Sequence, residues 1–130
     1  MTELMQRILP TVQKPARYTG GEWGEIKKDL EDVRVRVAFC FPDTYEIGMS
    51  NLGMRILYGV MNGMDGVWCE RVFAPWGDME QAMRDNVLPL WALESQTPVR
   101  EFDMIAFTIG YEMSYTNVLN MLRLSGVPLH

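Results

Sequence analysis

The first strong pattern in the sequence is a hydrophobic period of two. Val33, Val35, Val37 and Phe39 occupy alternate positions of the segment 33–41, which predicts a β-strand. The second half of this segment is almost continuously apolar, so we expect it to be buried on both faces, as in a parallel sheet.

A helical period follows the strand. Leu52, Ile56 and Val60 are spaced by four residues and predict an amphipathic helix, which Ser50 or Asn51 can cap. A strand followed directly by a helix is half of a βαβ unit.

Two further units of the same kind are predicted downstream. Strands are expected at 67–73 and 103–109, and the second is nearly all apolar, as in a strand covered on both faces. Asp78 and Gln81 have the spacing of a capping box at a helix start. A third amphipathic helix is expected from Tyr115 onward.

This alternation predicts an α/β fold, namely a Rossmann-like or flavodoxin-like three-layer sandwich with a mostly parallel sheet. Three units leave an uncovered sheet edge, which is a candidate surface for self-association. We expect residues 1–32 to form an N-terminal arm, and 33–130 to form the α/β domain. The segment 127–129 leads toward another strand, so this domain is expected to be incomplete at its C-terminus.

Composition narrows the function classes. The chain has 130 residues, of which 48% are hydrophobic, and a formal net charge of -5. A folded domain is therefore expected, and nucleic acid is not an expected partner. No apolar run is long enough to span a membrane, so a cytoplasmic location is predicted. Cys40 and Cys69 form neither a C-x-x-C pair nor a disulfide framework and are interpreted as buried thiols.

The turns after the first and third strands are the predicted functional site, because ligands of open parallel sheets bind beyond the carboxyl ends of the strands. We expect both turns to line one cavity at the rim of the sheet. The candidate cofactor-binding residues are Asp43, Thr44, Tyr45, Glu46, Gly48, Ser50 and Asn51 in the first turn, and Thr108, Gly110, Tyr111, Glu112 and Ser114 in the second.

Each candidate also has a structural interpretation. Asp43 either orients a ligand or closes an Asx turn, and Ser114 either contacts a ligand or caps a helix. Gly48 permits either a positive φ or the close approach of a ligand. The only histidine is His130, and neither a P-loop nor a G-x-G-x-x-G motif occurs, so no catalytic residue and no metal ligand is predicted.

Four strings resemble the amino-terminal region of a family of large bacterial radical S-adenosylmethionine (radical SAM) proteins, which carry a cobalamin-binding-like domain ahead of the radical domain. They are RYTGGE at 17–22, AFCFPDTYEIGMSNLG at 38–53, WCERVFAPW at 68–76 and EMSYTNVL at 112–119.

The resemblance implies a cofactor as well as a fold. Cobalamin domains of the broader class carry D-x-H-x-x-G after the first strand, whereas this chain has Asp43-x-Tyr45-x-x-Gly48. Histidine ligation of cobalt is thereby excluded at this position. The remaining alternatives are cobalamin bound without that histidine, a different ligand, or a domain that has kept the fold and lost the cofactor.

The family's radical chemistry requires a C-x-x-x-C-x-x-C motif, which Cys40 and Cys69 do not match. The resemblance therefore assigns the [4Fe-4S] cluster and S-adenosylmethionine to a C-terminal radical SAM domain of the same polypeptide, the expected partner. The leading hypothesis is an accessory domain for cofactor or substrate recognition, inactive alone. One alternative is a docking module whose Met- and Trp-rich surface covers the radical domain. The other is a flavodoxin-like nucleotide binder.

Overall fold

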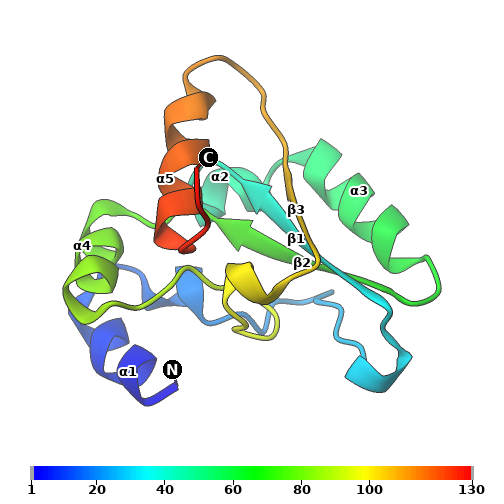
Figure 1. Cartoon of the computed structure of the whole chain (residues 1–130), viewed down its shortest axis with the longest axis horizontal. Coiled ribbons are helices and arrows are strands. Elements are labelled where there is room, and N and C mark those ends of the chain that lie inside the picture. Colours follow the sequence, from blue (N-terminus) through cyan, green and yellow to red (C-terminus); the bar gives the residue numbers. More distant parts are fainter. Residues whose placement is uncertain (1, 130) are drawn as a thin grey trace.

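Three parallel strands form the centre of the structure, a computed structural model that describes residues 2–129 (Figure 1). They are β1 (Val35–Phe41), β2 (Val67–Phe73) and β3 (Met104–Phe107), in the order β2-β1-β3. Both pairings are parallel. The order 2-1-3 is the one with which flavodoxin-like sheets begin. The predicted α/β fold with a parallel sheet is confirmed.

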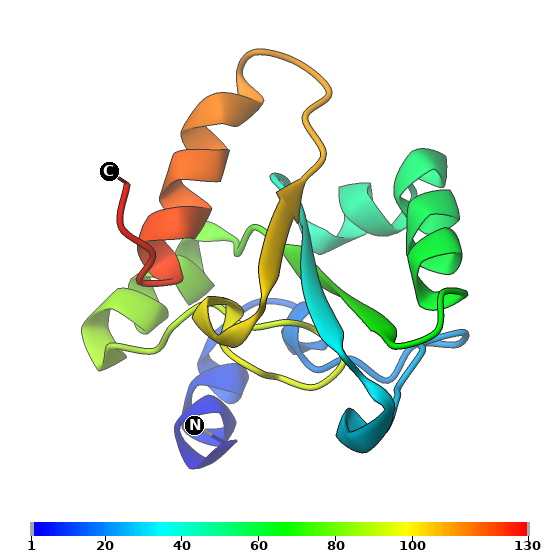
Figure 2. The ribbon, with the colours of Figure 1, turned by 45° about the vertical axis from the view of Figure 1, so that its right-hand side comes forward.

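Helices cover both faces of the sheet (Figure 2). One core joins α3 (Leu52–Asn62) to alternate residues of β1 and β2, including Val37, Phe39 and Cys69. The other core joins the opposite faces of these strands to three further helices, which are α1 (Thr2–Ile8), α4 (Gly77–Asn86) and α5 (Ser114–Leu124). The short elements are the α-helix α2 (Tyr45–Met49) and the 3₁₀ turns η1 (Leu9–Thr11), η2 (Pro15–Tyr18), η3 (Leu30–Asp32) and η4 (Val99–Glu101).

The predicted strand at 33–41 is β1, which begins two residues later than expected. Its residues Val37 to Cys40 are at most 5% exposed, so the expected burial of the second half is confirmed. The strand predicted at 67–73 coincides with β2. The turn after β1 contains α2, a short helix that the hydrophobic pattern did not indicate.

The helix predicted after β1 is present as α3, but the stripe that predicted it faces solvent. Leu52, Ile56 and Val60 are exposed, and the buried residues of α3 include Met54 and Tyr58. Met54 and Tyr58 thus face the core, and the aliphatic stripe of α3 faces solvent.

Of two other local predictions, the capping box is wrong and the third strand is confirmed but shorter than expected. The capping box is absent, because Asp78 accepts hydrogen bonds from the main-chain nitrogens of Met79 and the distant Gln13, while Gln81 donates to Asp85. The strand predicted at 103–109 is present as the four residues of β3, which lies at the sheet edge and is only partly buried, not fully buried as expected.

The N-terminal arm, residues 2–32, contributes to both the core and the corner between α3 and β2. Met5 and Tyr18 are buried in the core shared with α4. Lys28 donates from Nζ to the main-chain oxygens of Asn62 at 2.7 Å and Val67 at 2.6 Å. These are the last residue of α3 and the first of β2, so the ammonium group holds the ends of these elements together.

Both cysteines are buried and free, as predicted. Burial raises the pKa of the Cys40 thiol strongly and that of Cys69 to about 12, so neither is a reactive thiolate at neutral pH. Among the described residues, no helix combines the length and the apolar character needed to cross a membrane.

Candidate functional site

A hollow of about 190 Å³ lies at the carboxyl ends of β1 and β3. From the end of β1 the chain continues to β2, which lies on one side of β1, whereas β3 lies on the other side of β1. The end of β1 is therefore the topological switch point, the place where open α/β sheets bind ligands. We call it the switch-point hollow. It is lined by Phe41, Pro42, Asp43, Ile47, Asn51, Thr108, Gly110, Tyr111 and Ser114.

The two turns that form the hollow are tied together directly. Asn117 of α5 donates from Nδ2 to the main-chain oxygen of Pro42 at 2.9 Å. The main-chain nitrogen of Thr108 donates to the oxygen of Cys40 at 3.2 Å, which extends the contact between β1 and β3 beyond the end of the strand. The turn after β1 and the turn before α5 therefore share one rim.

The polar groups of the hollow are only partly used by the fold. Asp43 accepts a hydrogen bond from the main-chain nitrogen of Thr44 at 2.7 Å, and Asn51 caps α3 by accepting from that of Met54 at 2.8 Å. Ser114 is 3% exposed. Within residues 2–129, no hydrogen bond engages its hydroxyl or that of Thr108, so both are available to a ligand.

Of the candidate residues, Tyr45 points away from the hollow. Its ring packs edge to face on Phe73, with 5.6 Å between the ring centroids. Burial and the neighbouring Glu22 raise the pKa of the Tyr45 phenol to about 12. The position that would carry the cobalt-ligating histidine thus belongs to the packing between α2 and β2.

Glu46 and Gly48 are also engaged by the fold. Glu46 accepts from Nε of Arg17 at 2.8 Å, and the Arg17 guanidinium lowers the pKa of this carboxyl. Gly48 packs so tightly that a Cβ at this position would overlap the ring of Phe73. The glycine therefore permits close approach between α2 and β2 and does not line the hollow.

Of the remaining candidates, two line the hollow and three do not. Gly110 and Tyr111 line it together with Asp43, Asn51, Thr108 and Ser114. Thr44 precedes α2, and its side chain makes no cap. The hydroxyl of Ser50 donates to the main-chain oxygens of Glu46 and Ile47, while Glu112 is exposed beside the rim.

Sequence reasoning missed a buried charge cluster on β2. Nε of Arg71 donates to Glu94 at 2.6 Å, and Nη2 lies 3.6 Å from Glu22. The Arg71 guanidinium also stacks on the ring of Tyr58, 4.4 Å from its centroid. Glu22 and Arg71 lie in two of the four family-like strings, whereas nothing in the sequence indicated Glu94.

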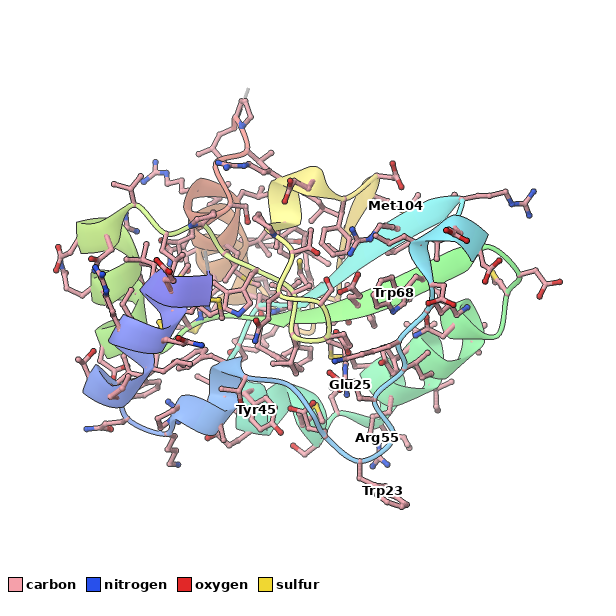
Figure 3. All side chains as sticks on the ribbon, turned by 90° about the horizontal axis from the view of Figure 1, so that it is seen from below. Trp23, Glu25, Tyr45, Arg55, Trp68 and Met104 are labelled. Atoms are coloured by element: carbon pink, nitrogen blue, oxygen red, sulfur yellow. The ribbon has the colours of Figure 1, made fainter. Side chains whose placement is uncertain are left out.

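The cluster borders a second hollow, of about 380 Å³, between the arm and α3. Trp23 and Arg55 line its mouth from these two segments, and both are labelled in Figure 3. Among residues 2–129, no group of three or more His, Cys, Asp or Glu side chains is arranged to hold a metal ion.

Residues 53–130, more than half of the chain, match the protein family described as "Radical SAM proteins, N-terminal". This chain belongs to that family. The resemblance to radical SAM proteins is thus confirmed, and the chain is an accessory N-terminal region of such a protein. The matched range contains the second turn of the switch-point hollow, whereas the first turn lies before it. No curated protein and no solved structure matches the chain.

Proposed function

We propose that this radical SAM region is an accessory ligand-binding domain, which holds a cofactor or substrate at the switch-point hollow and has no catalytic activity alone. Cobalamin is the cofactor we propose. Its partner is the radical SAM domain of the same polypeptide, which would carry the [4Fe-4S] cluster and S-adenosylmethionine in the bacterial cytoplasm.

The observation that carries the proposal is the convergence of polar side chains, only partly used by the fold, at one end of the sheet. The hollow is lined by Thr108, which follows β3, by Ser114, the first residue of α5, and by Asn51, which caps α3. Because α3 and α5 both begin at this rim, their amino termini add positive electrostatic potential. The arrangement suits a ligand with carbonyl or phosphate oxygens.

The chemistry of the residues limits how cobalamin would bind. Tyr45 packs on Phe73, and its raised pKa keeps the phenol neutral, so we assign it no role as a cobalt ligand. A hollow of about 190 Å³ is smaller than the roughly 300–1,000 Å³ typical of sites for drug-sized ligands. We therefore propose that the hollow takes only a peripheral amide or phosphate group of the cofactor, held by Thr108, Ser114 and Asn51.

A titration with hydroxocobalamin tests this proposal in the 130-residue chain and in the full-length radical SAM protein, with retention after desalting as the readout. Ser114→Ala and Thr108→Val each remove one hydroxyl from the hollow, and we expect about three- to tenfold weaker retention for each. Ser50→Ala is the matched control, since its hydroxyl bonds within α2 outside the hollow. We expect it to bind like the wild type.

The alternative function is a docking module that has lost its cofactor. It is favoured by the exposure of large side chains beside the rim, where Tyr111 is 55% and Met113 77% exposed. Failure of both proteins to retain hydroxocobalamin would reject the cofactor proposal in favour of docking. Retention of a flavin instead would favour a flavodoxin-like nucleotide binder.

A further inference from the structure

The second hollow, of about 380 Å³, is enclosed by the arm, α2, α3 and Arg71 of β2. We call it the arm hollow. It shares no lining residue with the switch-point hollow. Its volume falls in the range of roughly 300–1,000 Å³ that is typical of small-molecule sites. The arm hollow can therefore take the body of a small molecule.

The walls of the arm hollow are mostly apolar and leave space that the fold does not fill. Ile26 lines it from the arm, and Met54 and Tyr58 line it from α3. Gly59, one residue after Tyr58, also lines it, and a Cβ on Gly59 would meet no atom within 4 Å. Apolar walls with a few polar groups are the usual composition of a ligand pocket.

Arg71 is the polar group of the inner end. Its side chain is largely buried, and of the five N–H donors of its guanidinium, the one on Nε donates to Glu94 at 2.6 Å. Nη1 reaches only the sulfur of Met49 at 3.3 Å, and Nη2 has no hydrogen-bond partner within residues 2–129. Because a thioether is a weak acceptor and an unpaired buried donor is costly, Arg71 has capacity for an oxygen acceptor.

The charge of Arg71 is already matched. Glu94 pairs with it directly, and Glu22 lies 3.6 Å from Nη2. Glu25, the other carboxylate of this part of the arm, accepts from the main-chain nitrogen of Gly21 and does not line the hollow. The inner end therefore suits a neutral oxygen, such as a carbonyl, better than a further negative charge.

The mouth has a different character. Trp23 is fully exposed, and Figure 3 shows it pointing away from the protein. Arg55 is exposed as well, and no carboxylate within residues 2–129 forms an ion pair with it. An indole offers a flat apolar face to a ligand, and a guanidinium without a carboxylate partner attracts a negative group.

We propose that the arm hollow binds a small molecule with a flat apolar body, a carbonyl oxygen at its inner end, and a carboxylate or phosphate at its outer end. The carbonyl would accept from Arg71 in place of the sulfur of Met49, whose flexible side chain can move aside. The negative group would pair with Arg55, and Trp23 would cover the body. This site does not depend on cobalamin binding.

Three related compounds test these features. The probe 7-methoxycoumarin-4-acetate has a flat body, a carbonyl and a carboxylate, whereas 7-methoxy-4-methylcoumarin lacks the charge and 6-methoxynaphthalene-2-acetate lacks the ring carbonyl. Equilibrium dialysis measures their binding to the full-length radical SAM protein and to the 130-residue chain. We expect both proteins to bind the coumarin acetate, and each of the other compounds about three- to tenfold more weakly.

Three results of this dialysis would overturn the proposal. They are absence of saturable binding of the coumarin acetate, equal binding of all three compounds, and binding to the 130-residue chain but not to the full-length protein. The last result would show that the radical SAM domain, and not a small molecule, occupies the hollow.

Substitutions locate the bound probe. We expect Gly59→Leu to abolish saturable binding of the coumarin acetate, since its side chain grows into the open space of the hollow. Gly77→Leu at the start of α4 is the matched control, because a Cβ there also meets no atom within 4 Å. Arg55→Met should weaken binding about three- to tenfold, whereas Arg123→Met, exposed on α5, should not. Urea unfolding checks that each variant is folded.

One further variant separates this site from the proposed cofactor site. Ser114→Ala alters only the switch-point hollow, so we expect it to bind the coumarin acetate like the wild type. Gly59→Leu should in turn retain hydroxocobalamin like the wild type. Loss of the coumarin acetate in Ser114→Ala together with its retention in Gly59→Leu would place the probe in the switch-point hollow and overturn the inference.

Discussion

The side chain of Asn117 donates a 2.9 Å hydrogen bond to the main-chain oxygen of Pro42, and so joins the first turns of α5 to the end of β1. These residues are 75 positions apart. The bond is a direct link between the two turns of the switch-point hollow, and its removal tests whether the rim needs it.

We expect Asn117→Leu to lower the free energy of unfolding by about 1 kcal/mol, since it removes one hydrogen bond and leaves the oxygen of Pro42 unpaired. Urea unfolding measures this change. Asn120→Leu is the matched control on the same helix, because its partner Arg84 is exposed. We expect the control to change stability by no more than about 0.5 kcal/mol. Equal losses of unfolding free energy in both variants would show that the hydrogen bond from Asn117 to Pro42 does not stabilise the rim more than an exposed contact does.

Gly48→Ala tests the packing of α2 on β2. The added methyl group would overlap the ring of Phe73, so we expect a loss of about 1–3 kcal/mol in urea unfolding. Gly59→Ala in α3 meets open space and should stabilise by about 0.5–1 kcal/mol. The double variant Gly48→Ala/Phe73→Leu should recover part of the loss. A neutral Gly48→Ala would argue that this glycine serves something other than packing.

The raised pKa of Tyr45 predicts a dependence of stability on alkaline pH. Between the ordinary pKa near 10 and the folded value of about 12, the unfolded chain releases the phenolic proton and the folded chain keeps it. Folding stability contributed by Tyr45 is therefore present below pH 10 and lost as the pH rises toward 12. We expect the stability of the wild type to fall more steeply across this window than that of Tyr45→Phe, as measured by urea unfolding at successive pH values. Parallel curves would contradict the assignment.

The buried pair of Arg71 and Glu94 is expected to be sensitive to the loss of one partner. Glu94→Gln leaves the Arg71 charge without its closest partner, so we expect a loss of about 3–5 kcal/mol. The double variant Arg71→Met/Glu94→Leu removes both charges and should lose less than the single variant. Glu80→Gln, in an exposed pair with Arg84, should cost under about 1 kcal/mol. Thermal unfolding of the four proteins would check this order.

The sequence pattern predicted the strands better than the helix faces. The apolar residues from Val33 to Phe39 predicted β1 correctly, because a strand buried in a parallel sheet needs apolar residues that are close together in the sequence. In α3 the spacing of Leu52, Ile56 and Val60 indicated the helix but not its orientation. Tyr58 and Met54 face the core because the arm and β2 supply their partners there, and those partners are distant in sequence.

Side-chain partners distant in sequence also explain the missed site features. Asp78 had the spacing of a capping box, but its carboxylate accepts from Gln13, 65 positions away. Arg71 and Glu94 pair across 23 positions, and no local spacing predicts such a contact. The convergence of Asp43 and Ser114 could be predicted because parallel topology alone brings strand ends to one rim.

The contacts of Lys28 limit where this protein can be divided. Its ammonium group satisfies carbonyl oxygens at the junction of α3 and β2, and the rest of the arm supplies core side chains. Excision at residue 33 would remove these groups together and leave the junction without its cation. A shortened version that begins with β1 is therefore a poor starting point for expression or crystallisation, and a protein made for these purposes should retain the first thirty-two residues.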